Sequence, residues 1–325
     1  MRVIGATGAD VLNSSFQRTL FLHGQEDITL HAARGDTTMV KLLHEFGCRD
    51  KYGLKKLRHR LNVSHPHHQH GAAAHTRVRR SHVAVDVGSN LGDFAIALYK
   101  KDPSMRILAL EPMPHTYTFL RWNLMSNRVP LLSADAFFNR HGGEDGGESA
   151  VMGGGGVLAL NMAVTSDGRN VSIEYSPHLS GFGTTSASTQ SRTGPPPRTS
   201  MVSNTPDVER RTIGSLHLAR WLAERRIHKL DFLKIDCEGC EHEVVPSFDP
   251  TLLQHTMAFE GEIHTCSARA GHGCHYDRPS LQKTLSDLCT SFPTGNESRT
   301  LWVQAEHSSS LSCLSWQAPH RPSLG

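Results

Sequence analysis

The sequence predicts an α/β fold built on a doubly wound, mostly parallel sheet. Short apolar runs that end in an acidic residue recur along the middle of the chain, as expected of buried parallel strands. Between them, apolar residues follow a helical spacing, so strand, helix, strand and helix succeed one another within about forty residues. Because crossovers between parallel strands are right-handed, this alternation places helices on both faces of one sheet.

The first unit begins with a strand over residues 82–88 and continues into a helix. Four apolar positions mark one face of that helix at i, i+3, i+4 and i+7, namely Leu91, Phe94, Ala95 and Leu98. A second strand is expected over residues 106–111, where Pro112 and Pro114 prevent its continuation and a second helix follows. Together these elements form a βαβα unit.

The next part of the chain alternates between loops and shorter elements. A glycine-rich, acidic stretch over residues 139–156 is interpreted as a surface insertion. A hairpin is then expected from a strand over residues 157–164 through Asp167-Gly168 to the alternating residues 171–175, and a loop over residues 176–206. The remaining expected elements are a helix over 213–222, a strand over 230–236, a helix after residues 237–241 and a final strand over 256–263.

These elements divide the chain into three parts. Residues 1–78 form an N-terminal extension, partly disordered, with a basic run over 51–60 and a histidine-rich stretch after it. Residues 79–265 hold the α/β domain. Residues 266–325 lack a clear pattern and are expected to form a loosely structured tail.

Composition excludes several classes of protein. The net charge is +3, from 34 Lys and Arg against 31 Asp and Glu, which is too near balance to indicate a nucleic-acid partner. No apolar run is long enough for a membrane span, and no secretory signal is recognised at the N-terminus. Seven cysteines, an odd number without a close framework, favour reduced thiols and a cytoplasmic location. The oligomeric state is left open.

A glycine-containing loop follows the first strand and is the first candidate binding element. It reads Asp86-Val87-Gly88-Ser89-Asn90-Leu91-Gly92 and opens the first helix. Glycine lacks the Cβ atom that would keep a ligand away from the backbone, and ligands bind beyond the carboxyl ends of strands in doubly wound sheets. The Gly-x-Asn-x-Gly spacing differs from the Gly-x-Gly-x-x-Gly pattern of dinucleotide-binding loops.

Glu111 ends the second strand and is the second candidate. An acidic residue at this position can accept hydrogen bonds from both hydroxyl groups of a ribose. The loop and Glu111 together indicate a ribose-bearing cofactor, but they do not distinguish NAD from S-adenosylmethionine.

The third candidate element is the run Leu230-Asp231-Phe232-Leu233-Lys234-Ile235-Asp236-Cys237-Glu238-Gly239-Cys240-Glu241. It places charged groups at the carboxyl end of a buried strand. A buried carboxylate such as Asp236 is costly without a partner, so we expect it to meet a cation, a metal or a ligand.

Taken in order, these three motifs resemble the FkbM family of methyltransferases over about residues 82–264. The resemblance implies a class I, Rossmann-like methyltransferase that uses S-adenosylmethionine and acts on a hydroxyl acceptor, either a small molecule or a glycan or lipid. It implies cofactor contacts at Asp86, Gly88, Asn90, Gly92, Glu111 and, by a looser match near the adenine, Asp135. It also places Asp236, Glu238, Glu262 and His264 at the reacting end of the site.

The expected reaction is an in-line displacement, in which positioning of the acceptor supplies most of the acceleration. A base near the acceptor hydroxyl would help, and His264 is the first candidate because the pKa of histidine lies near neutrality. Asp236 is expected to orient the acceptor or to offset the positive charge of the cofactor.

Two other functions remain open on the sequence alone. An NAD(P)-dependent oxidoreductase would share the fold and Glu111, but this sequence lacks the phosphate-binding glycine loop of such enzymes. A non-catalytic binding module would leave the carboxylates without a function. A zinc site is a further possibility at Cys237, Cys240, Cys266 and Cys274 with His264, His272 and His275. Because the spacing of the second cysteine pair departs from the usual pattern, no metal and free thiols are the default expectation.

Overall fold

The computed structural model describes a set of separate ranges of the chain. These are residues 15–20, 28–33, 82–138, 154–175, 183–186, 209–263 and 300–305, with the single positions 36, 38, 42, 54 and 283.

The central element is a six-stranded sheet in which every neighbouring pair is parallel. Its strands are β3 (Val83–Val87), β4 (Arg106–Leu110), β5 (Gly156–Leu160), β11 (Phe232–Ile235), β12 (Ala258–Ile263) and β13 (Thr300–Ala305). Their spatial order is β13-β12-β11-β3-β4-β5. When these six strands are numbered 1 to 6 along the chain and the sheet is followed from β5 to β13, the order is 3-2-1-4-5-6, which is the arrangement of doubly wound folds. The predicted fold class is confirmed.

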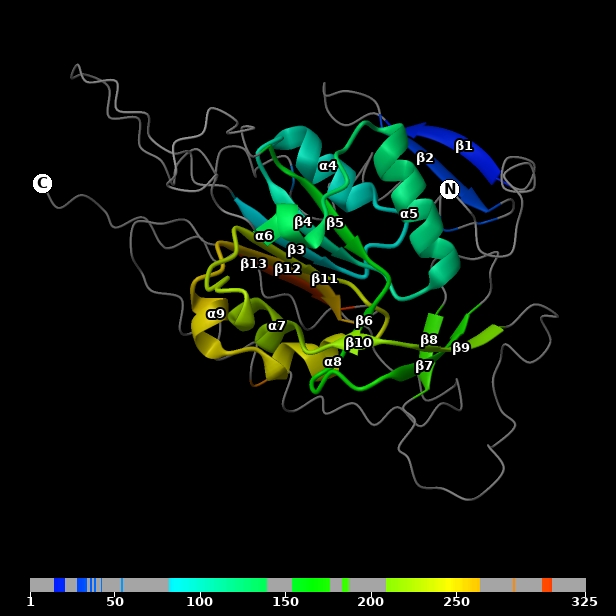
Figure 1. The fold of residues 1–325 in the computed structure, drawn as a ribbon. Helices are drawn as coiled ribbons and strands as arrows, with labels where there is room; N and C mark the ends of the chain where they lie inside the picture. Colours follow the sequence, from blue (N-terminus) through cyan, green and yellow to red (C-terminus); the bar gives the residue numbers. More distant parts are fainter. Residues whose placement is uncertain are drawn as a thin grey trace, which may run out of the picture.

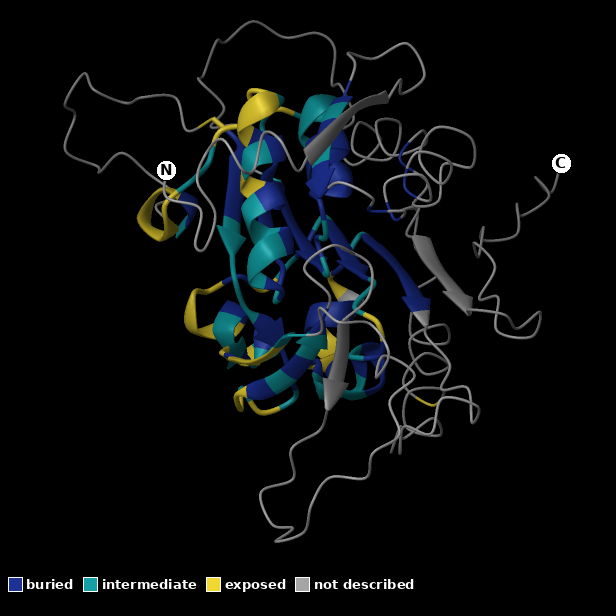
Figure 2. Ribbon diagram, turned by 90° about the vertical axis from the view of Figure 1, so that its right-hand side faces the viewer, coloured by how far each residue is buried: buried dark blue, intermediate teal, exposed yellow. Residues whose placement is uncertain are grey.

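Helices cover both faces of this sheet (Figure 1). One face packs against α4 (Asp93–Lys101) and α5 (Pro114–Ser126), and its apolar core includes Ala84, Ile107 and Phe232. The other face packs against α7 (Leu218–Glu224), α8 (Glu241–Val244), the 3-10 helix η2 (Val245–Ser247) and α9 (Pro250–Gln254). A short helix, α6 (Ala134–Phe138), follows α5. Figure 2 shows buried residues along the strands, with exposed ones gathered in turns and at helix ends.

Smaller sheets surround the central one. In the N-terminal part, β1 (Ser15–Leu20) and β2 (Ile28–Ala33) form an antiparallel pair, and Ile28, Leu30 and Ala32 are fully buried. After β5, the two-residue strands β6 (Ala163–Val164) and β10 (Ser215–Leu216) pair in parallel. The strand β7 (Val171–Tyr175) lies between β8 (Gly183–Ser186) and β9 (Glu209–Ile213) in an antiparallel sheet.

The hairpin prediction for residues 157–175 is wrong. Gly168 does lie in a turn with a φ angle of +79°, but the strand before it pairs with β10 and the strand after it pairs with β8 and β9. The expected single strand over 157–164 is divided at Asn161, whose side-chain Nδ2 donates to the carbonyl oxygens of Glu111 and Pro112 at 2.8 and 2.9 Å.

Two further expectations are corrected. The helix expected over residues 213–222 begins only at Leu218, because Ile213 ends β9 and residues 215–216 form β10. The strand over 256–263 is not the last one, since β13 pairs in parallel with β12 along six residues from each strand. Strands β2 and β13 thus lie in ranges that the sequence assigned to an extension and a tail; the three-part division itself stays a prediction. None of the described helices is long and apolar enough to cross a membrane.

Candidate functional site

The candidate site lies at the carboxyl ends of β3 and β11, where the strand order changes direction. The backbone of the two loops is in contact there, because Gly88 adopts a φ angle of +76° and a Cβ atom on it would lie 1.9 Å from the carbonyl oxygen of Asp236. Only glycine allows this approach. The amides of Gly88 and Ser89 both donate to the carbonyl oxygen of Leu110, which ties the loop to β4.

The rest of the loop is held in an unusual backbone conformation. Asn90 and Gly92 have φ angles of 47° and 86°, in the left-handed region. A Cβ atom on Gly92 would lie 2.5 Å from Leu120 Cδ1, so glycine is required for packing on α5 as well. The side-chain Oδ1 of Asn90 is buried and has no hydrogen-bond partner among the described residues. A buried acceptor without a donor is a place where a ligand can bind.

Glu111 supports this loop directly from the end of β4. Its Oε2 accepts a hydrogen bond from the Asn90 amide at 2.9 Å, and its Oε1 accepts one from the Met113 amide at 2.9 Å. Burial, with 3% of the residue exposed, raises the pKa of Glu111 to about 7. An ionised carboxylate has about four lone-pair sites, so two remain for further donors.

Beneath the loop, Lys234 forms an ion pair with Asp86 across the β11–β3 boundary. The Lys234 Nζ atom lies 3.0 Å from Asp86 Oδ1 and donates to the Gly88 carbonyl oxygen at 2.7 Å. Asp86 is fully buried, and burial raises its pKa in spite of Lys234. The resemblance implied a cofactor contact at Asp86, which stays a prediction; the structure adds that Asp86 is the partner of a buried lysine.

Lys234 lies within the third sequence motif but was not among the predicted site residues. Burial by itself lowers the pKa of Lys234, but the carboxylates of Asp86, Asp236 and Asp93 more than offset this and raise it. A lysine between apolar residues of a buried strand needs an acidic partner. The position of Lys234 within an apolar run was therefore the sequence signal that could have identified it. With Glu111, four carboxyl groups therefore interact with the Lys234 ammonium group.

The loop after β11 carries the second group of predicted site residues. Asp236 is half-buried, and Glu238 is exposed with a φ angle of 55°. The buried Glu241 accepts a hydrogen bond from the Cys237 amide through Oε1 at 2.8 Å, which closes the turn. Cys237 and Cys240 are joined by a disulfide with a Cα–Cα distance of 5.5 Å. The expectation of free thiols is therefore wrong for this pair.

The neighbouring strand β12 contributes two buried carboxylates. Lys234 is aligned with Glu260 in the parallel register, and Glu262 lies two residues further toward the carboxyl end of β12. Glu260 and Glu262 are 1% and 7% exposed. His264, the predicted base, lies outside the described residues, as do Cys266, Cys274, His272 and His275 of the possible zinc site. Within the described ranges, no group of three or more Cys, His, Asp or Glu residues could hold a metal ion.

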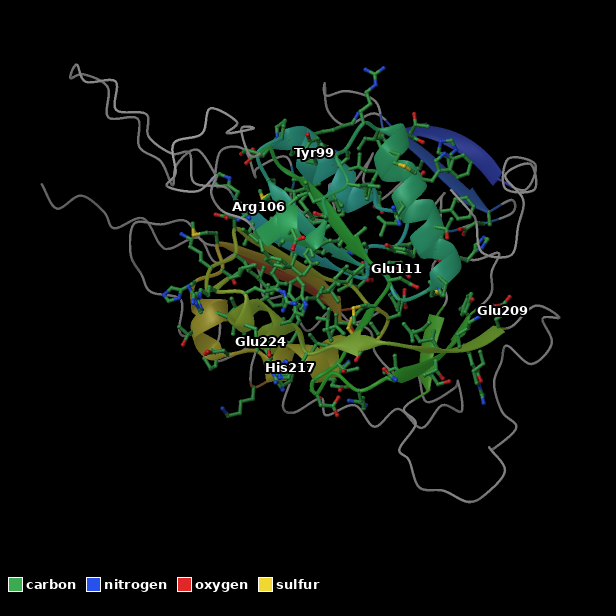
Figure 3. All side chains as sticks on the ribbon, viewed as in Figure 1. Tyr99, Arg106, Glu111, Glu209, His217 and Glu224 are labelled. Carbon is green, nitrogen blue, oxygen red and sulfur yellow. A yellow bond between two sulfur atoms is a disulfide. The ribbon has the colours of Figure 1, made fainter. Side chains whose placement is uncertain are left out.

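The structure does not bring Asp135 to this site. Asp135 is exposed on α6, whose Phe137 carbonyl oxygen accepts a hydrogen bond from Arg106, the first residue of β4. Arg106 and Glu111 mark opposite ends of β4 (Figure 3), so α6 lies at the amino end of the sheet. At the carboxyl end of β5, the residue beside Glu111 is Asn161.

An open parallel sheet in this strand order, with a glycine loop and a strand-end carboxylate at its switch point, defines a Rossmann-like fold. The family model of the FkbM methyltransferase domain matches residues 86–269, which is more than half of the chain. The chain belongs to this family and is therefore a methyltransferase, as the resemblance implied. No curated protein and no solved structure matches it.

Proposed function

We propose that this methyltransferase uses S-adenosylmethionine and transfers the methyl group to a hydroxyl oxygen. The observation that carries the proposal is the buried carboxylate of Glu111, which holds the Asn90 amide and keeps lone pairs for two more donors. These are the requirements for the two hydroxyl groups of a ribose.

The charge of the site supports this cofactor. S-adenosylmethionine carries a positive sulfonium group, and the carboxyl groups of Asp86, Asp93, Glu111 and Asp236 all lie near enough to interact with Lys234 at this site. The negatively charged phosphates of a dinucleotide would be repelled by the same carboxylates. The orphaned Oδ1 of Asn90 offers a further acceptor for a hydroxyl or an amino group.

When bound, the cofactor supplies a methyl group on a positively charged sulfur, so the carbon–sulfur bond breaks as the oxygen–carbon bond forms. The residues of the chain need to align the acceptor oxygen with that carbon, and such alignment contributes on the order of 7–11 kcal/mol. Asp236 and Glu238 are proposed to orient the acceptor at the end of β11. The hydroxyl proton passes to a base, for which the candidates are Glu262 on β12 and His264, two residues later in the sequence.

Calorimetry tests the cofactor. We expect S-adenosylmethionine to bind and NAD not to bind, and Glu111→Gln to weaken binding by about 10- to 100-fold, because it removes a charge-assisted acceptor. Glu224→Gln, at an exposed carboxylate of α7, is the matched control and should bind as the wild type does. Binding of NAD instead would favour the oxidoreductase alternative.

The acceptor is identified by transfer of a labelled methyl group. The wild-type protein is incubated with labelled S-adenosylmethionine and a metabolite extract, and the labelled product is characterised. We expect the label on an ether oxygen; a label on nitrogen would contradict the proposed acceptor class but not the proposed cofactor.

A further inference from the structure

Two asparagines, one in α5 and one directly after its last residue, attach the N-terminal strand β2 to the domain. Asn123 and Asn127 are one helical turn apart and face the backbone of β2, which lies beside α5 in Figure 1. Asn123 accepts from the His31 amide at 2.6 Å and donates to the His31 carbonyl oxygen at 3.0 Å. Asn127 accepts from the Thr29 amide at 3.0 Å and donates to the Thr29 carbonyl oxygen at 2.7 Å. The two carboxamides thus pair with β2 as a neighbouring strand would.

The two asparagines differ in their third hydrogen bond. The second N–H of Asn127 donates to the carbonyl oxygen of Asn123 in its own helix, at 2.8 Å. The second N–H of Asn123 donates instead to the carbonyl oxygen of Leu91, at 2.9 Å. Leu91 follows Asn90 in the glycine loop, so one fully buried side chain joins β2 to the proposed cofactor site.

We propose that Asn123 is a positioning residue for the glycine loop, and that β2 acts on cofactor binding through it. This inference rests on the proposed function, because it concerns affinity for S-adenosylmethionine. Strand β2 lies outside the family-matched segment, which begins at residue 86. The cofactor site therefore extends to a part of the chain that the family domain does not include.

The geometry gives Asn123 little freedom to act otherwise. The Oδ1 atom and both N–H groups of the Asn123 carboxamide form hydrogen bonds. Because the His31 amide fixes the Oδ1 atom, the second N–H group points at the Leu91 carbonyl oxygen only while β2 is packed on α5. The loop is held from the other sides by Glu111, at the Asn90 amide, and by Lys234, at the Gly88 carbonyl oxygen. Without Asn123, the Leu91 carbonyl group loses its side-chain donor, and this corner of the loop is held less firmly.

The asparagine pair provides its own control. Asn123→Leu and Asn127→Leu each remove three side-chain hydrogen bonds and the same kind of attachment to β2. We expect Asn123→Leu to weaken binding of S-adenosylmethionine about tenfold, as for the loss of one buried hydrogen bond, and Asn127→Leu to weaken it less than threefold. In the double variant, affinity should equal that of Asn123→Leu while thermal stability falls further, because β2 acts through Asn123.

Hydrogen exchange of the loop gives a readout that needs no cofactor. The peptide covering residues 88–95 should exchange faster in Asn123→Leu than in Asn127→Leu, at a temperature where both variants are folded. Should Asn123→Leu not fold, Asn123→Ala replaces it in both measurements. Equal affinities and equal exchange in the two single variants would overturn the inference, whereas a wild-type protein that does not bind S-adenosylmethionine would overturn the proposed function.

Discussion

At the scale of single residues, the site depends on a few side chains that are buried and charged at once. Glu111 and Lys234 each bind a backbone group of the glycine loop, one from each side of the switch point. Because the two residues are almost fully buried, their hydrogen bonds do not compete with water. The loop is thus placed before any ligand binds, which lowers the cost of binding.

The raised pKa of Glu111 gives the protein a specific dependence on pH. The pKa is about 7 in the folded protein and 4.5 in an ordinary glutamate, so between these values only the folded state holds the proton. Stability is therefore greatest below about pH 4.5 for this group and falls as pH rises to 7, by on the order of 3 kcal/mol. Urea denaturation at pH 5 and pH 8 should show this loss in the wild type.

Glu111→Gln carries no titrating group at this position, so the same two measurements should differ less in the variant. Groups that do not interact with Glu111 titrate alike in both proteins, so the difference between the two pH effects reports Glu111 together with its electrostatic coupling to Asp86 and Lys234. An identical pH effect in wild type and variant would contradict the expected pKa.

At the scale of elements, the loop after β11 is the segment whose conformation most needs support. Glu238 and Gly239 have consecutive positive φ angles of 55° and 111°, and the first costs a non-glycine residue about 1 kcal/mol. The Cys237–Cys240 disulfide and the Glu241 carboxylate both close this turn. Glu238, which is proposed to orient the acceptor, therefore lies inside a covalently closed turn, and Asp236 directly precedes that turn.

Reduction of this disulfide should lower stability without unfolding the domain. Closing a loop of this length restricts the unfolded chain by ~2 kcal/mol in the chain-entropy account. We expect a reductant to lower the denaturation midpoint of the wild type more than that of the Cys237→Ser/Cys240→Ser double variant, because only the wild type carries this link. A wild type that responds no more than this variant would show that the link does not stabilise the fold.

Elements with local signals were predictable from the sequence, and those with distant partners were not. The strand–helix–strand unit from β3 to β4 has its apolar spacing, its glycines and its end-of-strand acids within a few residues of one another. The pairing of β7 with β9 instead of β6, and of β13 with β12, joins segments far apart in the chain, which local periodicity does not encode. The position of Asp135 likewise depends on where α6 packs, which local periodicity does not encode.

At the scale of the whole molecule, the sheet consists of two halves that meet between β3 and β11. One half is β3-β4-β5 and the other is β11-β12-β13, and the Asp86–Lys234 ion pair crosses their boundary. The same boundary carries the glycine loop and Asp236, so residues of both halves meet at the proposed site. The buried charges are therefore both a structural requirement and part of the proposed binding site.

A double-mutant cycle on this ion pair tests how the halves are joined. Lys234→Met leaves the carboxylate of Asp86 buried without its cation and should lower the free energy of unfolding by about 3–5 kcal/mol. Asp86→Asn combined with Lys234→Met removes the uncompensated charge as well, so the double variant should be more stable than Lys234→Met alone. Denaturation curves of the four proteins measure the coupling. If the two substitutions lowered stability additively, the pair would not be the link between the halves, and the other carboxylates around Lys234 would have to supply its counter-charge.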